Sequence, residues 1–143
     1  MLPMELHRGR LIDHIHLVVK DVEASYRFYA AVFAELGIPI GAHHAGDHFY
    51  CDELFVSSAT SKSALGMLTG RVHLAFQGRD RAQVERVHAA AIAAGGTDNG
   101  GPGERQYHPG YYGAFVLDPD GNNIEVVYHG PAKASASSIV ITV

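Results

Sequence analysis

The sequence predicts an α+β fold in which two βαβββ modules stand in pseudo-symmetric tandem and form a curved sheet around a cleft. Each half opens with a strand of alternating apolar residues and continues with a helix that an aspartate begins and a glycine ends. The landmarks recur at an offset of 59 residues for the strand histidine and the capping aspartate, and of 58 residues for the glycine. The pairs are His14 and His73, Asp21 and Asp80, and Gly37 and Gly95. Three aligned landmarks favour an internal duplication.

The first module covers residues 12–57. Residues 12–20 alternate between an apolar and a more polar face, which predicts a half-buried strand. Asp21 stands at the N-cap of a helix whose apolar residues recur at helical spacing, and Gly37 stands at its C-cap. Three short strands are predicted next, over residues 40–45, 48–51 and 53–57.

The second module covers residues 71–129 and repeats this order. A strand is predicted over 72–77, and a helix begins at Asp80 and ends at Gly95. A glycine-rich connection over residues 97–113 leads to the last hairpin. Its parts are a strand over 114–117, a turn over 118–121 and a strand over 124–128.

The modules form one domain over residues 12–129, joined by a linker over 58–70 that is rich in Ser, Thr, Gly and Ala. A C-terminal tail over residues 130–143 differs in composition. Residues 131–138 are predicted to be flexible, and residues 139–143 to pair as an edge strand.

Composition excludes several classes of protein. Of the 143 residues 47% are hydrophobic and 18% charged, as in globular proteins, and the formal net charge of −4 offers no basic surplus for nucleic acid. No apolar run reaches the length of about 20 residues that a membrane helix needs. The start of the chain has Pro3, Glu5 and Arg8 where a signal peptide would be apolar, so we expect a soluble, cytoplasmic protein. Cys51 is alone, which excludes an internal disulfide and a cysteine-built zinc site, and no base that would activate it is recognisable.

Two histidines and a glutamate share one strand face. His14 and His73 occupy equivalent positions opposite the apolar side chains, and Glu125 falls on the same side of the last strand. Imidazole and carboxylate groups are ligands for a divalent metal that keeps positions open for a substrate. His16 shares the face of His14 and is the alternative ligand, although its spacing to Asp21 has no counterpart in the second module. We expect Fe, Mn, Ni, Co or Zn as the cofactor.

The segment over residues 105–113 contains three tyrosines and a histidine between glycines, just before the last hairpin. Its place suits a mobile lip over the site, with Tyr112 or His108 as a substrate-binding hydrogen-bond donor or proton carrier. The alternative is a loop that aromatic packing anchors.

Three stretches resemble the vicinal oxygen chelate superfamily, which includes glyoxalase I, fosfomycin-resistance transferases, bleomycin-resistance proteins and extradiol dioxygenases. They are IDHIHLVVKDVEASYRFYAAVFAELG, RVHLAF and GAFVLDPDGNNIEVVYH, and the resemblance covers about residues 12–129. It implies that His14, His73 and Glu125 bind the metal and that Glu125 is catalytic. Glyoxalase-like members bind the metal with a fourth protein ligand, and Glu53 is the only acidic candidate for it in this chain. A set of three protein ligands, two histidines and a glutamate, instead resembles that of the dioxygenases and thiol transferases.

The resemblance implies a metal-dependent enzyme that chelates two neighbouring oxygens of a small, oxygen-rich substrate. Isomerisation of the lyase type, thiol transfer and ring cleavage all stay open as reactions. The alternative is a non-catalytic protein that sequesters a small molecule, as bleomycin-resistance proteins do, although those members lack the ligands. A homodimer and a monomer both stay open.

Overall fold

The computed structural model describes residues 5–8, 11–64, 66–131 and 139–142 of the chain. The predicted α+β class with two βαβββ modules is confirmed. Contacts divide the described residues into two compact units. Unit 1 holds the strands of the first module, and unit 2 holds the second module together with helix α1 (Val22–Leu36) from Ala24 onward.

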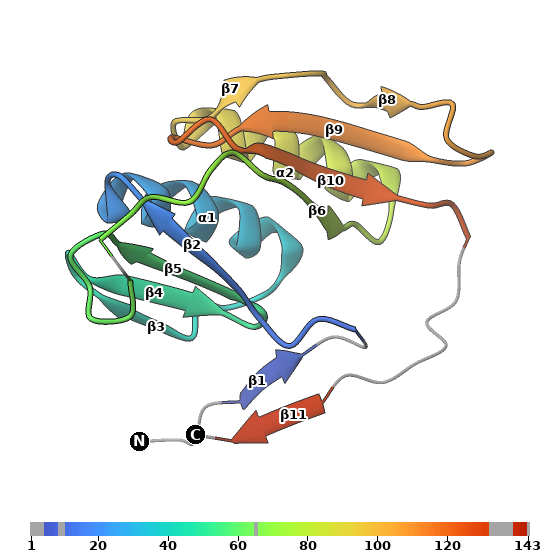
Figure 1. Ribbon diagram of the computed structural model, residues 1–143. Helices are drawn as coiled ribbons and strands as arrows, with labels where there is room; N and C mark the ends of the chain where they lie inside the picture. The colour runs from blue at the N-terminus through green and yellow to red at the C-terminus, as the bar shows by residue number, and fades with distance from the viewer. Residues whose placement is uncertain (1–4, 9–10, 65, 132–138, 143) are drawn as a thin grey trace. The chain divides into compact units, whose positions relative to one another are not determined.

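Unit 1 contains the four-stranded sheet of the first module (Figure 1). Its strands lie in the order β2-β5-β4-β3, with β2 parallel to β5 and the other neighbours antiparallel. The bounds are β2 (Ile15–Val19), β3 (Ala42–His44), β4 (His48–Cys51) and β5 (Leu54–Ser58). The same unit holds an antiparallel pair of strands, β1 (Glu5–Arg8) and β11 (Ile139–Thr142).

Unit 2 contains the sheet of the second module, in the order β6-β10-β9-β7, with β8 also paired to β9. Strand β10 runs parallel to β6 and antiparallel to β9. The bounds are β6 (His73–Gln77), β7 (Thr97–Asp98), β8 (Gly103–Glu104), β9 (Tyr112–Leu117) and β10 (Asn123–Tyr128). Helix α2 (Arg81–Ala93) packs on β9 and β10 (Figure 1). In both sheets the first strand of the module lies beside the last one. The strand that precedes the last one in sequence comes next, and the first strand after the helix lies at the far edge. The duplication predicted from the sequence is therefore confirmed at the level of topology.

Both helices begin at the predicted aspartates. The carboxylate of Asp21 accepts the backbone N–H of Glu23 at 3.1 Å, and that of Asp80 accepts the backbone N–H of Gln83 at 2.7 Å. Each bond satisfies a donor that the first turn of a helix leaves without an internal partner. Helix α1 is followed by Gly37 at φ +74°, a left-handed conformation that glycine adopts without strain.

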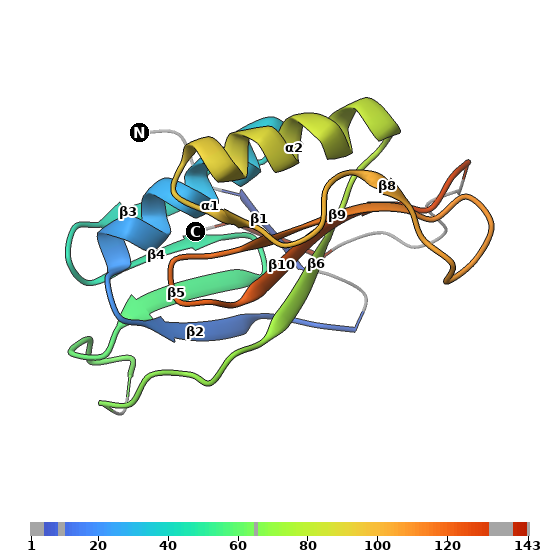
Figure 2. The ribbon, with the colours of Figure 1, turned by 90° about the horizontal axis from the view of Figure 1, so that it is seen from above.

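Helices α1 and α2 lie against one another within unit 2 (Figure 2). The side-chain amide of Gln83 in α2 donates to the carbonyl of Glu35 in α1 at 3.1 Å, and the ring of Phe33 packs edge to face on Phe76 of β6 at 5.2 Å. Apolar residues of both helices are buried, among them Tyr29, Phe33, Leu36, Val84, Val87 and Ala91. Helix α1 therefore belongs to the first module by sequence and to the core of the second by contact.

The turn between β9 and β10 is built around a buried carboxylate. Asp118 is 4% exposed, and its Oδ1 accepts the backbone N–H groups of Asp120 and Asn122 at 2.9 and 2.8 Å. Its Oδ2 accepts the side-chain amide of Asn122 at 2.8 Å and the hydroxyl of Tyr29 in α1 at 2.5 Å. Burial raises the pKa of Tyr29, and the charge of Asp118 raises it further, so the phenol stays a donor. This network fixes the start of β10.

Three strands were not predicted: β1, β7 and β8. The edge strand predicted over residues 139–143 is confirmed over Ile139–Thr142, and its partner is β1. Most of the predicted flexible segment, residues 132–138, lies outside the described residues. In the ranges that the structure describes, neither helix is long and apolar enough to cross a membrane.

Candidate functional site

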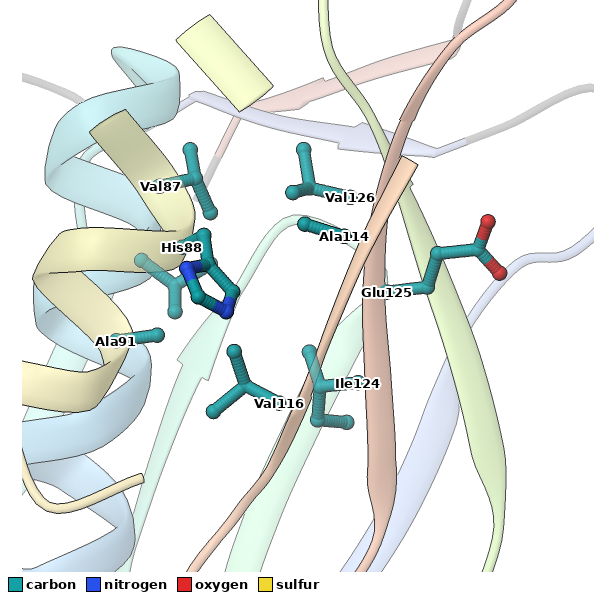
Figure 3. A pocket seen from close by; sticks show the side chains of 9 residues that line it. Val87, His88, Ala91, Ala114, Val116, Ile124, Glu125 and Val126 are labelled. Carbon is teal, nitrogen blue, oxygen red and sulfur yellow. The ribbon is translucent and has the colours of Figure 1, made fainter. Parts of the chain in front are cut away.

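The sheet of unit 2 has an apolar face and a polar face. The apolar face and the two helices line a small pocket, to which Glu125 contributes while its carboxylate points away from it (Figure 3). In register, Glu125 of β10 lies between Ala75 of β6 and Phe115 of β9. Because side chains alternate along a strand, these residues share the face opposite to the pocket. The candidate site is on this face.

Glu125 is the buried centre of a polar cluster. Its side chain is 3% exposed, and its Oε1 lies 2.9 Å from Nε2 of His73, whose side chain is 52% exposed. Its other oxygen, Oε2, accepts the hydroxyl of Tyr111. A Cβ at Gly113 would lie 3.1 Å from that oxygen and 3.3 Å from the ring of Tyr111, so the absence of a side chain there leaves room for their contact. We call these three residues the His73–Glu125–Tyr111 cluster.

Tyr111 is held by the loop that precedes β9. Its ring packs edge to face on His108 at 5.4 Å and on His129 at 5.3 Å. Those two imidazoles bond to one another, Nε2 of His108 to Nδ1 of His129, at 2.8 Å. Burial raises the pKa of Tyr111 and the bond to Glu125 raises it further, which keeps the phenol protonated and able to donate. His108, predicted to contact substrate, thus lies against Tyr111.

Tyr112, the other residue predicted to bind substrate, lies on the opposite face of the sheet. Its hydroxyl donates to Glu85 of α2 at 2.8 Å, and the guanidinium of Arg81 lies 4.6 Å from the centre of its ring. Tyr111, which was not predicted from the sequence, makes the contact with Glu125. The alternation of β9 would have indicated it, because Tyr111 shares the parity of Gly113 and Phe115.

The first-module histidines lie in unit 1. His14 precedes β2, its side chain is 59% exposed, and its Nδ1 lies 2.7 Å from the carboxylate of Asp13. His16, the alternative ligand, lies within β2, and its Nε2 is 2.7 Å from the hydroxyl of Ser57. Burial lowers the pKa of His16, and the charge of His14 lowers it further. Sequence position and strand face remain the grounds for preferring His14 as the ligand.

Strand register identifies the first-module equivalent of Glu125 as Phe55. His16 lies opposite Phe55 in β5, and Ala75, which stands 59 residues after His16, lies opposite Glu125 in β10. Glu53, the acidic candidate for a fourth ligand, does not occupy this position. Only Asp52 and Glu53 separate β4 from β5, so Glu53 lies in the turn before β5, whereas residues 118–122 separate β9 from β10. The position that would supply a fourth ligand by symmetry is thus aromatic.

The His73–Glu125 pair fits part of a metal site. Among the residues that the structure describes, no three or more His, Cys, Asp and Glu side chains are grouped so that they could hold a metal ion. The pair itself brings an imidazole nitrogen and a carboxylate oxygen to 2.9 Å. Neighbouring ligands about 2.1 Å from one ion would be separated by roughly 3 Å. A carboxylate as buried as Glu125 also favours a positive partner, which a divalent ion supplies.

Comparison with known proteins identifies the family. Residues 11–126 match the model of the Glyoxalase/Bleomycin resistance protein/Dioxygenase superfamily. The uncharacterized protein YqjT of Bacillus subtilis (strain 168) is 30% identical over 132 residues, which cover 81% of this chain and 97% of that protein.

Solved structures of the same kind are similar to this chain. A glyoxalase/bleomycin resistance protein from Albidiferax ferrireducens T118 has a TM-score of 0.67 at 30% identity, covering 82% of this chain and 98% of its own. A glyoxalase-related enzyme from Fulvimarina pelagi has a TM-score of 0.68 at 20% identity, covering 93% and 98%, which shows the fold. The chain therefore belongs to the Glyoxalase/Bleomycin resistance protein/Dioxygenase superfamily.

Proposed function

We propose that the chain is a divalent-metal-dependent enzyme that acts on a small, oxygen-rich substrate through two neighbouring oxygens. His14, His73 and Glu125 are the proposed ligands, with Glu125 also catalytic. The observation that carries the proposal is the buried carboxylate of Glu125 beside the imidazole of His73. The duplicated position of His14 and membership of the superfamily support it.

Bound there, Fe, Mn, Ni, Co or Zn would act as a Lewis acid that polarises substrate oxygens. Glu125 would supply the negative charge of the ligand set, and the two imidazoles would be neutral ligands. The hydroxyl of Tyr111 donates to one oxygen of Glu125, and the other oxygen of Glu125 lies beside His73. Isomerisation, thiol transfer and ring cleavage are all compatible with this arrangement.

Metal binding tests the proposal directly. We would strip the protein with a chelator and titrate each of the five divalent ions by calorimetry, with Fe(II) under anaerobic conditions. We expect one ion per chain, and a loss of affinity of at least about tenfold in His14→Ala, His73→Ala and Glu125→Gln. His43→Ala is the matched control, because His43 bonds to Glu23 elsewhere in unit 1. Undiminished affinity in the three variants, or no binding by the wild type, would contradict the proposal.

A specific observation favours a second candidate, a non-catalytic small-molecule binder. The position equivalent to Glu125 in the first module holds Phe55, which cannot ligate a metal. Activity decides between the candidates once a substrate is found among the three reaction classes. If the chain is an enzyme, removing the metal should abolish turnover and adding the metal back should restore turnover. If the chain is a non-catalytic binder, it should hold its ligand equally well without metal.

A further inference from the structure

Two exposed imidazoles meet at one end of the second sheet, and the proposed function uses neither of them as a ligand. His108 lies in the loop before β9, and His129 directly follows β10. Strands β9 and β10 are antiparallel, so both residues lie at the same end of the sheet (Figure 1). Nε2 of His108 is 2.8 Å from Nδ1 of His129, and the ring planes are inclined by 21°. We call these two residues the His108–His129 pair.

A tight turn brings His108 to this position. The backbone N–H of Tyr111 donates to the carbonyl of His108 at 3.1 Å, and Gly110, between them, has φ +88°. A proline followed by a left-handed glycine at the centre of such a turn is typical of type II. A Cβ at Gly110 would lie 3.3 Å from the carbonyl oxygen of His129 and 3.6 Å from Cα of Gly130. The lack of a side chain at this glycine therefore lets the loop approach the end of β10.

Hydrogen bonding determines which nitrogen of His108 carries the lone pair. Nδ1 of His108 lies 2.9 Å from the carbonyl oxygen of Pro109, which can only accept, so a neutral imidazole has its proton on Nδ1. Nε2 is then the unprotonated nitrogen, and it is the atom that faces His129. Metal-binding histidines almost always donate through their other nitrogen, often to a backbone carbonyl. His108 thus has the orientation of a ligand before any ion binds.

The pair also has the spacing of two ligands on one ion. Nitrogens about 2.0 Å from an ion, at neighbouring coordination positions, are separated by roughly 3 Å. Without metal, Nδ1 of His129 donates to Nε2 of His108. When an ion replaces that proton, the exposed imidazole of His129 takes a proton from water on its Nε2 and returns the other to water. Both rings stay neutral, so binding costs no net proton.

Two imidazoles discriminate among divalent ions. The affinity of a nitrogen site rises along the first transition row to a maximum at Cu(II). Two protein ligands are few, and water fills the other positions, so only the ion at the top of this order is held firmly. Cu(II) also prefers a planar set of nitrogen and oxygen ligands, which two imidazoles and water provide. The ions proposed for His14, His73 and Glu125 bind the pair more weakly.

We propose that the His108–His129 pair is a second metal site, which takes Cu(II) and is separate from the first. This inference goes beyond the proposed function and holds whether or not the first site binds an ion. One ligand precedes β9 and the other follows β10, so the ion connects the ends of the two strands. It also fixes the two imidazoles against which the ring of Tyr111 packs.

A copper titration followed by NMR tests the inference. We would add Cu(II) in small steps to the chelator-treated protein and follow the imidazole proton signals of its ten histidines. Cu(II) is paramagnetic and broadens the signals of its ligands, so those of His108 and His129 should broaden at substoichiometric copper. In His108→Ala and His129→Ala the signal of the remaining member should need at least about tenfold more copper. Nitrogen-15 shifts of the copper-free protein should show His108 protonated on Nδ1.

Two kinds of control separate the pair from other sites. His88→Ala is the matched control, because its imidazole belongs to the same unit and bonds to Asp98 at 2.9 Å. It should leave the copper affinity of the pair unchanged. Glu125→Gln and Tyr111→Phe keep the shapes of their side chains, so they should weaken the first site and leave copper binding by the pair as in the wild type.

Three results would overturn the inference. The signals of His108 and His129 could stay sharp while other histidines broaden, or copper affinity could be undiminished in His108→Ala and His129→Ala. Loss of copper from the pair in Glu125→Gln would show that the pair is not a separate site. Each result concerns the pair alone, so the first site can fail or succeed independently of it.

Discussion

Single residues decide what the polar face of unit 2 can bind. Glu125 is buried, and its two oxygens contact His73 and Tyr111. Neither contact is with a lysine or an arginine. A carboxylate in such surroundings holds its orientation through hydrogen bonds, and its charge stays available to a cation. Tyr111 is therefore a positioning residue for Glu125.

Replacing Tyr111 by phenylalanine tests this role. We expect Tyr111→Phe to weaken metal binding by about tenfold, because groups that orient a ligand typically affect affinity to this extent. Calorimetric titration of the stripped protein would measure it. Tyr112→Phe is the matched control, since its hydroxyl bonds to Glu85 on the other face. An unchanged affinity in Tyr111→Phe would mean that the hydroxyl does not orient the carboxylate for the ion.

Cys51 allows a prediction about pH. Its thiol is buried, its sulfur donates to the carbonyl of Pro39 at 3.4 Å, and burial raises its pKa to about 12. The thiolate is the reactive form, so alkylation by iodoacetamide at pH 8 should be at least about a hundredfold slower in the native than in the guanidinium-unfolded protein. The folded pKa lies above the unfolded one, so this group costs stability as pH rises from about 9 to 12. A native rate equal to the unfolded rate would contradict the prediction.

Among the elements, the turn between β9 and β10 positions the site. Its buried Asp118 joins the turn to Tyr29 of α1, so that a residue 89 positions earlier helps to hold the strand that bears Glu125. Neither partner has chemistry of its own in the mechanism. Their contribution is to fix the register of β10 against β6 and β9.

Loss of this link should be visible in stability. We expect Tyr29→Phe to lower the free energy of unfolding by about 1–3 kcal/mol, because a buried carboxylate loses one of its donors. Urea denaturation followed by circular dichroism would measure the change. Tyr107→Phe is the control, since Tyr107 is 72% exposed and should change stability little. A Tyr29→Phe variant as stable as the wild type would show that the turn does not depend on this bond.

The main elements could be predicted from the sequence because their signals are local. Alternation, an aspartate cap and a terminal glycine are enough for β2, α1, β6 and α2. Strands β7 and β8 span two residues each, too short for alternation to show, and were missed inside the glycine-rich connection. Strand β1 depends on a partner at the other end of the chain, β11, which no local pattern indicates.

The candidate site was predicted in part, for the same reason. Residue type and strand face were sufficient to select His73 and Glu125, which the structure brings together. Tyr111 was missed in favour of its neighbour Tyr112, because the start of β9 was placed at residue 114 and its parity was not followed back to 111. The first-module equivalent of Glu125 could not be identified from the sequence, because turns of different length shift the register of the strands that follow.

In the whole molecule, the boundaries of the two repeated modules differ from the boundaries of the two compact units. The two modules repeat at residues 12–57 and 71–129, and their sheets have the same strand order. The compact units divide the chain elsewhere, because α1 from Ala24 onward packs with the second module through Phe33 and Tyr29. The repeated stretch of sequence and the physical core are therefore not the same set of residues.

This placement of α1 has a consequence for the gene. A coding sequence cut in the linker over residues 58–70 would yield two halves of similar plan, neither of which contains a complete core. The N-terminal half would expose the face of α1 that bears Phe28 and Phe33, and the C-terminal half would lack the phenol that Asp118 binds. Such halves should recover their structure only when both are present, as complementing fragments of one protein.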